Sequence, residues 1–272
     1  MNQRIAIAVS PTGARKTRQD HPNLPLTPEQ IAREAARCLE AGACLLHLHV
    51  RRPDSSHSLD VDDYRAAMLA VQRAVGDRML IQITTEAMGK YTPAQQMQVV
   101  RSLRPEAVSV ALRELFCEEA AVATSAEFFA WMHQEHIIPQ LILYSANEVR
   151  DYLELRKRGA IPDDRHWVLF VLGSYSAERP ATAADLLPFV NCWMGESAIP
   201  WAVCAFGQNE AACVTAALTL GGHARVGFEN NVFLPGGSSA SYNHELVAVV
   251  SETAQGLGFA RADADTLRDW FQ

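Results

Sequence analysis

The chain has 272 residues, of which 49% are hydrophobic and 20% are charged, a composition typical of a soluble globular enzyme. Its formal net charge of -7 argues against a nucleic-acid-binding protein, because such proteins carry a basic surface for phosphate contacts. No apolar run approaches the roughly 20 residues that a membrane-spanning helix needs. We therefore expect neither a nucleic-acid partner nor a membrane partner.

The cysteines and the first residues of the chain bear on its compartment. Six cysteines are scattered along the sequence without a C-x-x-C pair, and most of them stand in apolar stretches. This pattern is typical of free thiols in a reducing environment. Residues 4–9 have the pattern of a folded strand rather than that of a signal peptide. We expect a cytoplasmic protein.

Short apolar runs alternate with amphipathic stretches along the whole chain. The predicted strands lie near residues 4–9, 43–49, 78–84, 106–111, 137–143, 166–172, 199–205 and 223–228. Such alternation predicts a parallel sheet, and eight units in a chain of this length predict a closed (β/α)8 TIM barrel. We expect residues 1–272 to form a single domain of this α/β class. The alternative is an open doubly wound sheet, but no G-x-G-x-x-G motif follows the first strand.

Two helix starts support this division of the chain. Residues 27–30 combine a capping threonine, a proline at the first helical position and a glutamine suited to a capping box. Residues 92–95 repeat the same pattern. Gly42 is predicted to end the first helix just before the second strand.

Two histidines stand at the end of the second predicted strand. Side chains on a strand alternate between its faces, so His47 and His49 point the same way. Their imidazoles can supply the first two ligands of a divalent metal ion. A pair of hydrogen-bonded polar residues at a strand end is the alternative, and this motif alone does not decide between them.

Catalytic groups of a TIM barrel gather where its strands end, which directs attention to Glu229 after the eighth strand. The second and eighth strands both flank the first, so Glu229 can reach His47 and His49. Two histidines and one carboxylate leave a coordination position open, as in catalytic zinc sites and non-haem iron sites. Glu229 could instead pair with Arg225 or cap a helix. Arg225, in turn, could bind a substrate carboxylate or hold Glu229 in place.

Several segments, spread over essentially the whole chain, resemble the β-keto acid cleavage enzyme family, whose type member is 3-keto-5-aminohexanoate cleavage enzyme. The matching segments are Thr12-Gly13-Ala14, residues 23–28, His47-Leu48-His49-Val50-Arg51, residues 170–173, residues 201–203 and residues 221–229. The resemblance implies a TIM barrel that holds zinc through His47, His49 and Glu229. It also implies a reaction of a β-keto acid with acetyl-CoA as co-substrate, giving acetoacetate and a new acyl-CoA. Relatives of this kind are commonly homo-oligomers.

The resemblance also suggests which residues contact the substrate. Arg225 would orient it, and the hydroxyl of Thr84 would donate to its carboxylate. We expect Thr12, Ser109 and Asn230 to contribute to substrate binding as well.

The chain departs from the family where protons are transferred. Members commonly carry acids at the positions of Asn230 and Ile142, and neither of these side chains can accept a proton at neutral pH. Glu86, after the third strand, is the candidate for a substitute base, although it could be an exposed loop carboxylate. Arg15 stands where members carry glutamate, which suggests a more anionic substrate such as a dicarboxylate.

Two other functions stay open from the sequence. One is a zinc-dependent, aldol-type carbon–carbon lyase that acts on a carbonyl acid without CoA. The other is a non-enzymatic barrel that binds a metal or a ligand.

Overall fold

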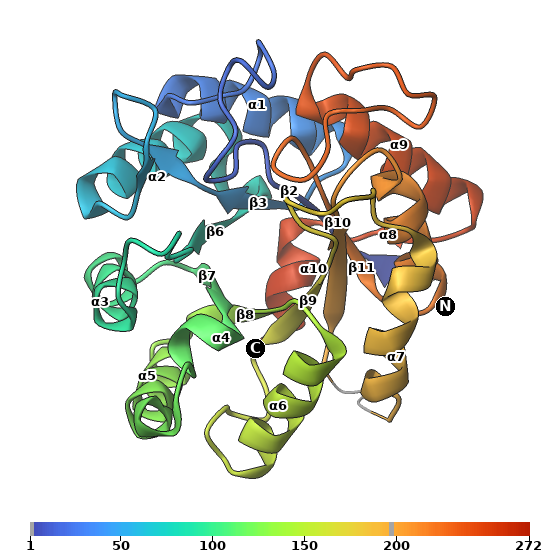
Figure 1. The fold of residues 1–272 in the computed structure, drawn as a ribbon. Coiled ribbons are helices and arrows are strands. Elements are labelled where there is room, and N and C mark those ends of the chain that lie inside the picture. Colours follow the sequence, from blue (N-terminus) through green and yellow to red (C-terminus); the bar gives the residue numbers. More distant parts are fainter. Residues whose placement is uncertain (1–2, 196–198) are drawn as a thin grey trace.

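A closed barrel of parallel strands forms the centre of the molecule (Figure 1). The computed structural model describes residues 3–195 and 199–272. The barrel strands are β2 (Ile7–Val9), β3 (Leu45–Leu48), β6 (Leu80–Thr84), β7 (Ala107–Ala111), β8 (Ile138–Leu143), β9 (Trp167–Leu172), β10 (Trp201–Ala205) and β11 (His223–Val226). Each lies within one predicted strand, and β11 pairs with β2 to close the ring. The predicted TIM barrel is confirmed.

Helices surround the barrel on its outside (Figure 1). The longer ones are α1 (Pro28–Ala41), α2 (Val61–Val75), α3 (Pro93–Leu103), α5 (Val122–Gln134), α6 (Ala146–Lys157), α7 (Leu187–Trp193), α8 (Glu210–Thr219) and α9 (Asn243–Gly256). Shorter elements are α4 (Leu112–Leu115), α10 (Ala264–Asp269), three 3-10 turns, and the strand pairs β1 (Arg4–Ile5) with β12 (Ala260–Arg261) and β4 (Val50–Arg51) with β5 (His57–Ser58). In the described part of the chain, no helix combines the length and apolarity needed to cross a membrane.

The predicted helix ends are present in the structure. Thr27 and Thr92 each form a complete capping box with the glutamine three residues on. Such a cap contributes about 1 kcal/mol, because it satisfies backbone N–H groups that the helix itself leaves unpaired. Gly42 ends α1 in the left-handed region, with φ of 115°. These caps set the points at which the chain enters α1 and α3 and at which it leaves α1 for β3.

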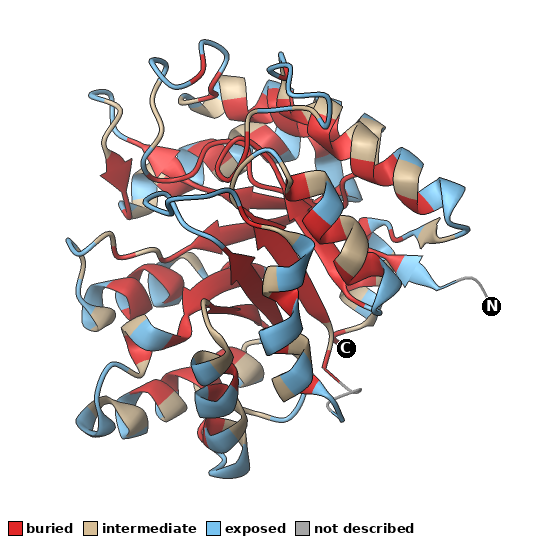
Figure 2. Cartoon of the chain, turned by 45° about the vertical axis from the view of Figure 1, so that its right-hand side comes forward, coloured by how far each residue is buried: buried red, intermediate tan, exposed pale blue. Residues whose placement is uncertain are grey.

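The core has two parts, because alternate side chains of each strand point inward and outward. On β6, Ile81 and Ile83 pack outward in the larger cluster beneath the helices. Leu80 points inward and belongs to a smaller cluster inside the barrel. Figure 2 shows the strands of the barrel buried throughout, with exposed residues on the outer helix faces and loops. Burial on both faces explains why the strands are continuous apolar runs in the sequence.

The C-terminal segment closes one end of the barrel, and in Figure 1 α10 is seen through the ring of strands. The ring of Phe271 lies 5.9 Å from that of Trp167, and the ring of Trp270 stacks on His223 at 4.8 Å. Trp167 and His223 begin β9 and β11, so this plug covers the N-terminal ends of the strands. This segment does not cover the opposite end of the barrel, where the strands finish. A functional site can therefore lie there.

Candidate active site

Three side chains that can bind a metal converge at the C-terminal ends of the strands. His47 lies on β3, His49 directly follows it, and Glu229 follows β11 on the far side of β2. The Nε2 atoms of the two histidines are 3.1 Å apart, and carboxylate oxygens of Glu229 lie 3.7 Å and 3.5 Å from them. All three side chains are buried, and one ligand atom from each lies within 4.8 Å of the others.

The protonation states of His47 and Glu229 suit a metal ion, which needs neutral imidazoles and an ionised carboxylate. Burial, and then the charge of Arg225, lowers the pKa of His47 to about 3. Burial alone would raise the pKa of Glu229, but Arg225 and the histidines outweigh it and hold that pKa well below its usual range. His49 also has a buried Nδ1 without a hydrogen-bond partner in the described structure. The residues therefore fit a metal centre with two nitrogen ligands and one oxygen ligand.

Gln82 on β6 orients one of the candidate ligands. Its Oε1 lies 2.8 Å from Nδ1 of His47, which is directly opposite it in the β3–β6 register. Because the amide oxygen can only accept, Nδ1 carries the proton, and Nε2 presents its lone pair toward His49 and Glu229. Sequence analysis did not identify Gln82, although its place two residues before Thr84 puts it on the same inward face.

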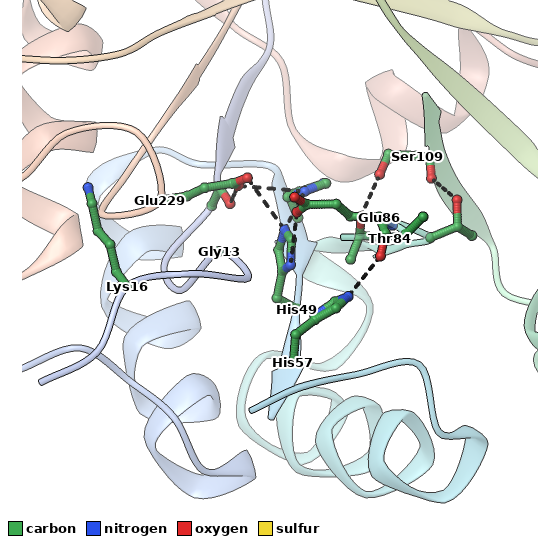
Figure 3. A network of polar contacts seen from close by, with 12 residues as sticks. Gly13, Lys16, His49, His57, Thr84, Glu86, Ser109 and Glu229 are labelled. Atoms are coloured by element: carbon green, nitrogen blue, oxygen red, sulfur yellow. Dashed lines mark hydrogen bonds and ion pairs between the residues drawn. The ribbon is translucent and has the colours of Figure 1, made fainter. Parts of the chain in front are cut away.

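Glu229 is positioned by the loop that follows β2. The hydroxyl of Ser10 donates to its carboxylate, and its backbone N–H donates to the Ser10 carbonyl at 3.1 Å. Gly13 packs against its side chain: a Cβ at Gly13 would lie 2.7 Å from Cγ of Glu229. Figure 3 shows Gly13 and Lys16 on the segment that runs beside Glu229. The left-handed φ of +66° at Gly13 is a second reason for glycine there.

Arg225 lies 3.6 Å from Oε2 of Glu229 and also lines the cavity at this site. Its Nη2 lies 3.2 Å from both Sγ of Cys204 and Oδ1 of Asn230. Its Nε has no hydrogen-bond partner among the described residues. Arg225 thus supports the candidate metal ligand and brings a buried positive charge to the cavity wall.

A cavity of about 440 Å³ opens above the candidate metal ligands. Among the predicted site residues, its lining includes His47, His49, Glu229, Arg225, Arg15, Thr84, Glu86 and Ser109. Tyr144 and Tyr175, which the sequence analysis did not select, also line it.

Two predicted substrate-binding residues do not line this cavity. The hydroxyl of Thr12 is buried and donates to the carbonyl of Pro25 at 2.9 Å, which fixes the loop after β2. Asn230 is buried behind Arg225 and accepts a hydrogen bond from it. Both side chains therefore support neighbouring parts of the site, and we assign them no direct contact with substrate.

Thr84 and Ser109 form a hydroxyl pair on the cavity wall, as Figure 3 shows. Ser109 donates to Oγ1 of Thr84 at 3.3 Å, and the backbone N–H of Glu86 donates to the same atom at 3.2 Å. With both lone pairs of Thr84 engaged, its own proton is free to be donated. The wall thus offers one hydroxyl donor to a bound molecule.

Glu86 is not an exposed loop carboxylate. Its side chain is 21% exposed, and its Oε2 lies 4.0 Å from Nδ1 of His49. Burial raises the pKa of Glu86, the negative charge of Glu229 adds to that shift, and the positive charge of Arg15 opposes it. His57 anchors its backbone by a contact of 2.8 Å from Nε2 to the Glu86 carbonyl oxygen. A partly buried acid with a raised pKa suits general acid–base chemistry.

A second buried acid, Glu210, supports the loop that carries Glu229. It accepts the backbone N–H of Gly227 at 3.2 Å and the side-chain amide of Asn231 at 3.3 Å. Burial raises its pKa to about 8. A glutamate at the first position of a helix is ordinary in a sequence, so no local signal distinguishes it.

The fold and the site define a class: a (β/α)8-barrel enzyme with a three-residue group suited to a metal at the C-terminal ends of its strands. Residues 4–272 match the model of the beta-keto acid cleavage enzyme family, and the chain belongs to that family. It is therefore an enzyme that cleaves carbon–carbon bonds, as predicted.

Comparison with individual proteins agrees with this assignment. The chain is 30% identical to a 3-keto-5-aminohexanoate cleavage enzyme of Acetoanaerobium sticklandii, over 94% of this chain and 93% of that protein. It is 26% identical to a 3-oxoadipate:acetyl-CoA acetyltransferase of Cupriavidus necator, over 95% of this chain and 91% of that protein. The apo structure of ObcA superposes with a TM-score of 0.72 at 19% identity. That match covers 92% of this chain and 65% of the ObcA chain, and it supports the fold.

Proposed function

We propose that this protein is a zinc-dependent β-keto acid cleavage enzyme, which converts a β-keto acid and acetyl-CoA into acetoacetate and a new acyl-CoA. The convergence of His47, His49 and Glu229 on one wall of the 440 Å³ cavity carries this proposal. The acetyl-CoA in the name of the Cupriavidus necator relative supports the choice of co-substrate.

The three converging side chains would hold the zinc ion. When bound there, zinc would supply a Lewis acid that stabilises negative charge developing on a carbonyl oxygen. Thr84 would direct its free proton toward the substrate carboxylate, with Ser109 and the Glu86 backbone fixing the direction of that bond. Arg225 would attract the same anionic group through its positive charge.

Glu86 is the base in this proposal. Its Oε2 would take a proton from the carbon between the ketone and the carboxylate of the β-keto acid. The resulting carbanion attacks the thioester carbon of acetyl-CoA and displaces CoA thiolate. The thiolate then attacks the original ketone carbon, and cleavage of the adjacent carbon–carbon bond releases the new acyl-CoA and the acetoacetate carbanion. This carbanion takes back the proton from Glu86, which gives acetoacetate and restores the base. A raised pKa keeps Glu86 basic enough for this transfer near neutral pH.

We further propose that the substrate carries a second negative charge, as a dicarboxylic β-keto acid does. Arg15 and Arg113 line the cavity in addition to Arg225. The guanidinium of Arg15 lies 5.2 Å from the ring centre of Tyr175, and that of Arg113 lies 3.7 Å from the ring centre of Tyr144. The 3-oxoadipate named for the Cupriavidus necator relative is a dicarboxylate of this kind.

A single incubation series tests the reaction. Zinc-loaded protein is mixed with acetyl-CoA and a panel of dicarboxylic, neutral and cationic β-keto acids, and the products are separated by mass spectrometry. We expect acetoacetate and the matching acyl-CoA in equal amounts, with the dicarboxylic substrates preferred. Cleavage of the keto acids at the same rate without acetyl-CoA would contradict the proposal and favour an aldol-type lyase.

A further inference from the structure

A second cavity, of about 580 Å³, lies beside the first, at the N-terminal ends of α1 and α2 and against the β4–β5 hairpin. Leu26, Ile31, Val50 and Ala67 form the apolar part of its lining. The two cavities share no lining residue among those described. The residues that act on the reacting atoms all line the first cavity, and the second contributes none of them.

Three arginines give this second cavity a positive charge, although the whole chain carries a net charge of -7. The side chains of Arg18 and Arg52 form no ion pair with any residue that the structure describes, and both residues are exposed. The carboxylate in the lining is that of Asp63, which accepts the hydroxyl proton of Ser58 at 2.6 Å. Two guanidinium groups are thus available to an anion at the rim of an apolar hollow.

The third arginine, Arg51, links this cavity to the candidate metal centre through Gly13. Arg51 is buried, and its guanidinium donates to the carbonyls of Gly13, Lys16 and Ser55 at 2.6 to 3.0 Å. None of these partners carries a charge, so the positive charge of Arg51 adds to that of the cavity. Gly13, in turn, packs against the side chain of Glu229.

One loop separates the two cavities. Arg15 lines the cavity of the candidate metal centre, and Arg18, three residues further along the same loop, lines the second cavity. Three residues span at most about 11 Å even when fully extended. The linings of the two cavities therefore approach each other to within about 11 Å, measured along the backbone, at this loop.

We propose that the second cavity binds the nucleotide end of acetyl-CoA, an adenosine with a 3′-phosphate and a 5′-diphosphate, while the pantetheine arm crosses the loop and delivers the thioester to the first cavity. This inference rests on the proposed function. Arg18 and Arg52 contact the phosphates, because guanidinium groups donate in pairs to phosphate oxygens. The positive charge of Arg51 adds to the attraction of the cavity for an anion. The adenine ring packs on the apolar lining.

The direct test measures binding of adenosine 3′,5′-bisphosphate by titration calorimetry. The variants are Arg18→Ala, Arg52→Ala and their double replacement. Arg73→Ala is the matched control, because Arg73 is an exposed arginine at the other end of α2. We expect each single change to weaken binding about tenfold, as the loss of one charge-assisted contact does, and the control to bind like the parent protein. Unchanged affinity in the double variant would overturn the assignment of the cavity.

Turnover supplies the second readout. The double variant is expected to raise the KM for acetyl-CoA while leaving kcat, and the KM for S-acetylpantetheine, unchanged, because S-acetylpantetheine lacks the nucleotide. If the parent protein binds the bisphosphate but turns over no β-keto acid, the proposed reaction fails while the nucleotide site stands. A double variant that changes its sedimentation but not its nucleotide affinity would make this cavity an interface between copies, and would overturn the inference.

Discussion

Nδ1 of His47 lies 2.8 Å from Oε1 of Gln82, and this one contact determines which nitrogen of the imidazole faces the candidate metal centre. The interaction joins neighbouring barrel strands at the same register position. A hydrogen bond of this kind to a metal-ligating histidine fixes both its tautomer and its ring orientation.

Replacing Gln82 with leucine should therefore weaken zinc binding without removing a ligand. We expect an affinity loss of about 10-fold to 100-fold, measured by competition with a chromogenic chelator. Gln140→Leu is the matched control, because Gln140 is also a buried inward-facing glutamine and makes no hydrogen bond to the candidate ligands. Equal affinity in the two variants would show that Gln82 has no orienting role.

Gly13→Ala should disturb the site through Glu229. The new methyl group would lie 2.7 Å from Cγ of Glu229, so the carboxylate must shift and zinc should bind more weakly. Gly89→Ala is the control, because Gly89 has nearly the same φ, +67°, with no atom near the added carbon. Both changes should cost about 1–2 kcal/mol of stability for the left-handed backbone, measured by urea unfolding. A loss of zinc affinity shared by both variants would contradict this explanation.

Glu86→Gln should lower turnover while leaving the zinc content unchanged. Removing a general base typically costs about 10²-fold to 10⁴-fold in rate. Glu114→Gln is the matched control. Glu114 is a neighbouring, partly buried acid whose carboxylate accepts a hydrogen bond from the N–H of Ala87, and it does not line the cavity. Zinc content is measured by elemental analysis and rate by product formation. Turnover of Glu86→Gln at the parental rate would exclude Glu86 as the base.

Glu210 should make the stability of the zinc-free protein depend on pH. Burial raises its pKa to about 8 in the folded protein, against an ordinary value of 4.5. The folded state then binds more protons than the unfolded state between these values, so this contribution to stability is present below pH 4.5 and is lost as pH rises through 8. The free energy of unfolding in urea, compared between pH 6 and pH 9, should fall more in the parent protein than in Glu210→Gln. An equal fall in both proteins would refute this account.

Arg15→Glu should alter the choice of substrate. The change replaces a positive charge on the cavity wall with a negative one, so kcat/KM should fall for dicarboxylic β-keto acids and rise for cationic ones. The ratio of the two specificity constants is the measurement. An unchanged ratio would remove Arg15 from the determinants of specificity.

The sequence was sufficient to predict the barrel and the convergence of the candidate metal ligands. Eight separated apolar runs and the capping patterns at Thr27 and Thr92 are local signals, and they placed the strands and helices correctly. The approach of Glu229 to the two histidines followed from the closure of the barrel, which brings β11 and β3 to either side of β2.

Other features depend on register and packing, which no local pattern reveals. Gln82 becomes a partner of His47 only through the alignment of β3 with β6. Thr12 was predicted to contact substrate from its match to the family pattern, but its hydroxyl donates to the carbonyl of Pro25. The arginines of the second cavity come from the loop after β2 and from the β4–β5 hairpin, and only the folded chain brings them together.

The most direct test of the account is a metal titration of the purified protein after treatment with a chelator. We expect acyl-CoA formation to disappear with the metal and to return in proportion to added zinc, reaching full activity at one ion per chain. In His49→Ala, zinc should not bind tightly and activity should not return. Full activity in metal-free protein, or zinc binding unaffected by loss of His49, would contradict the central claim.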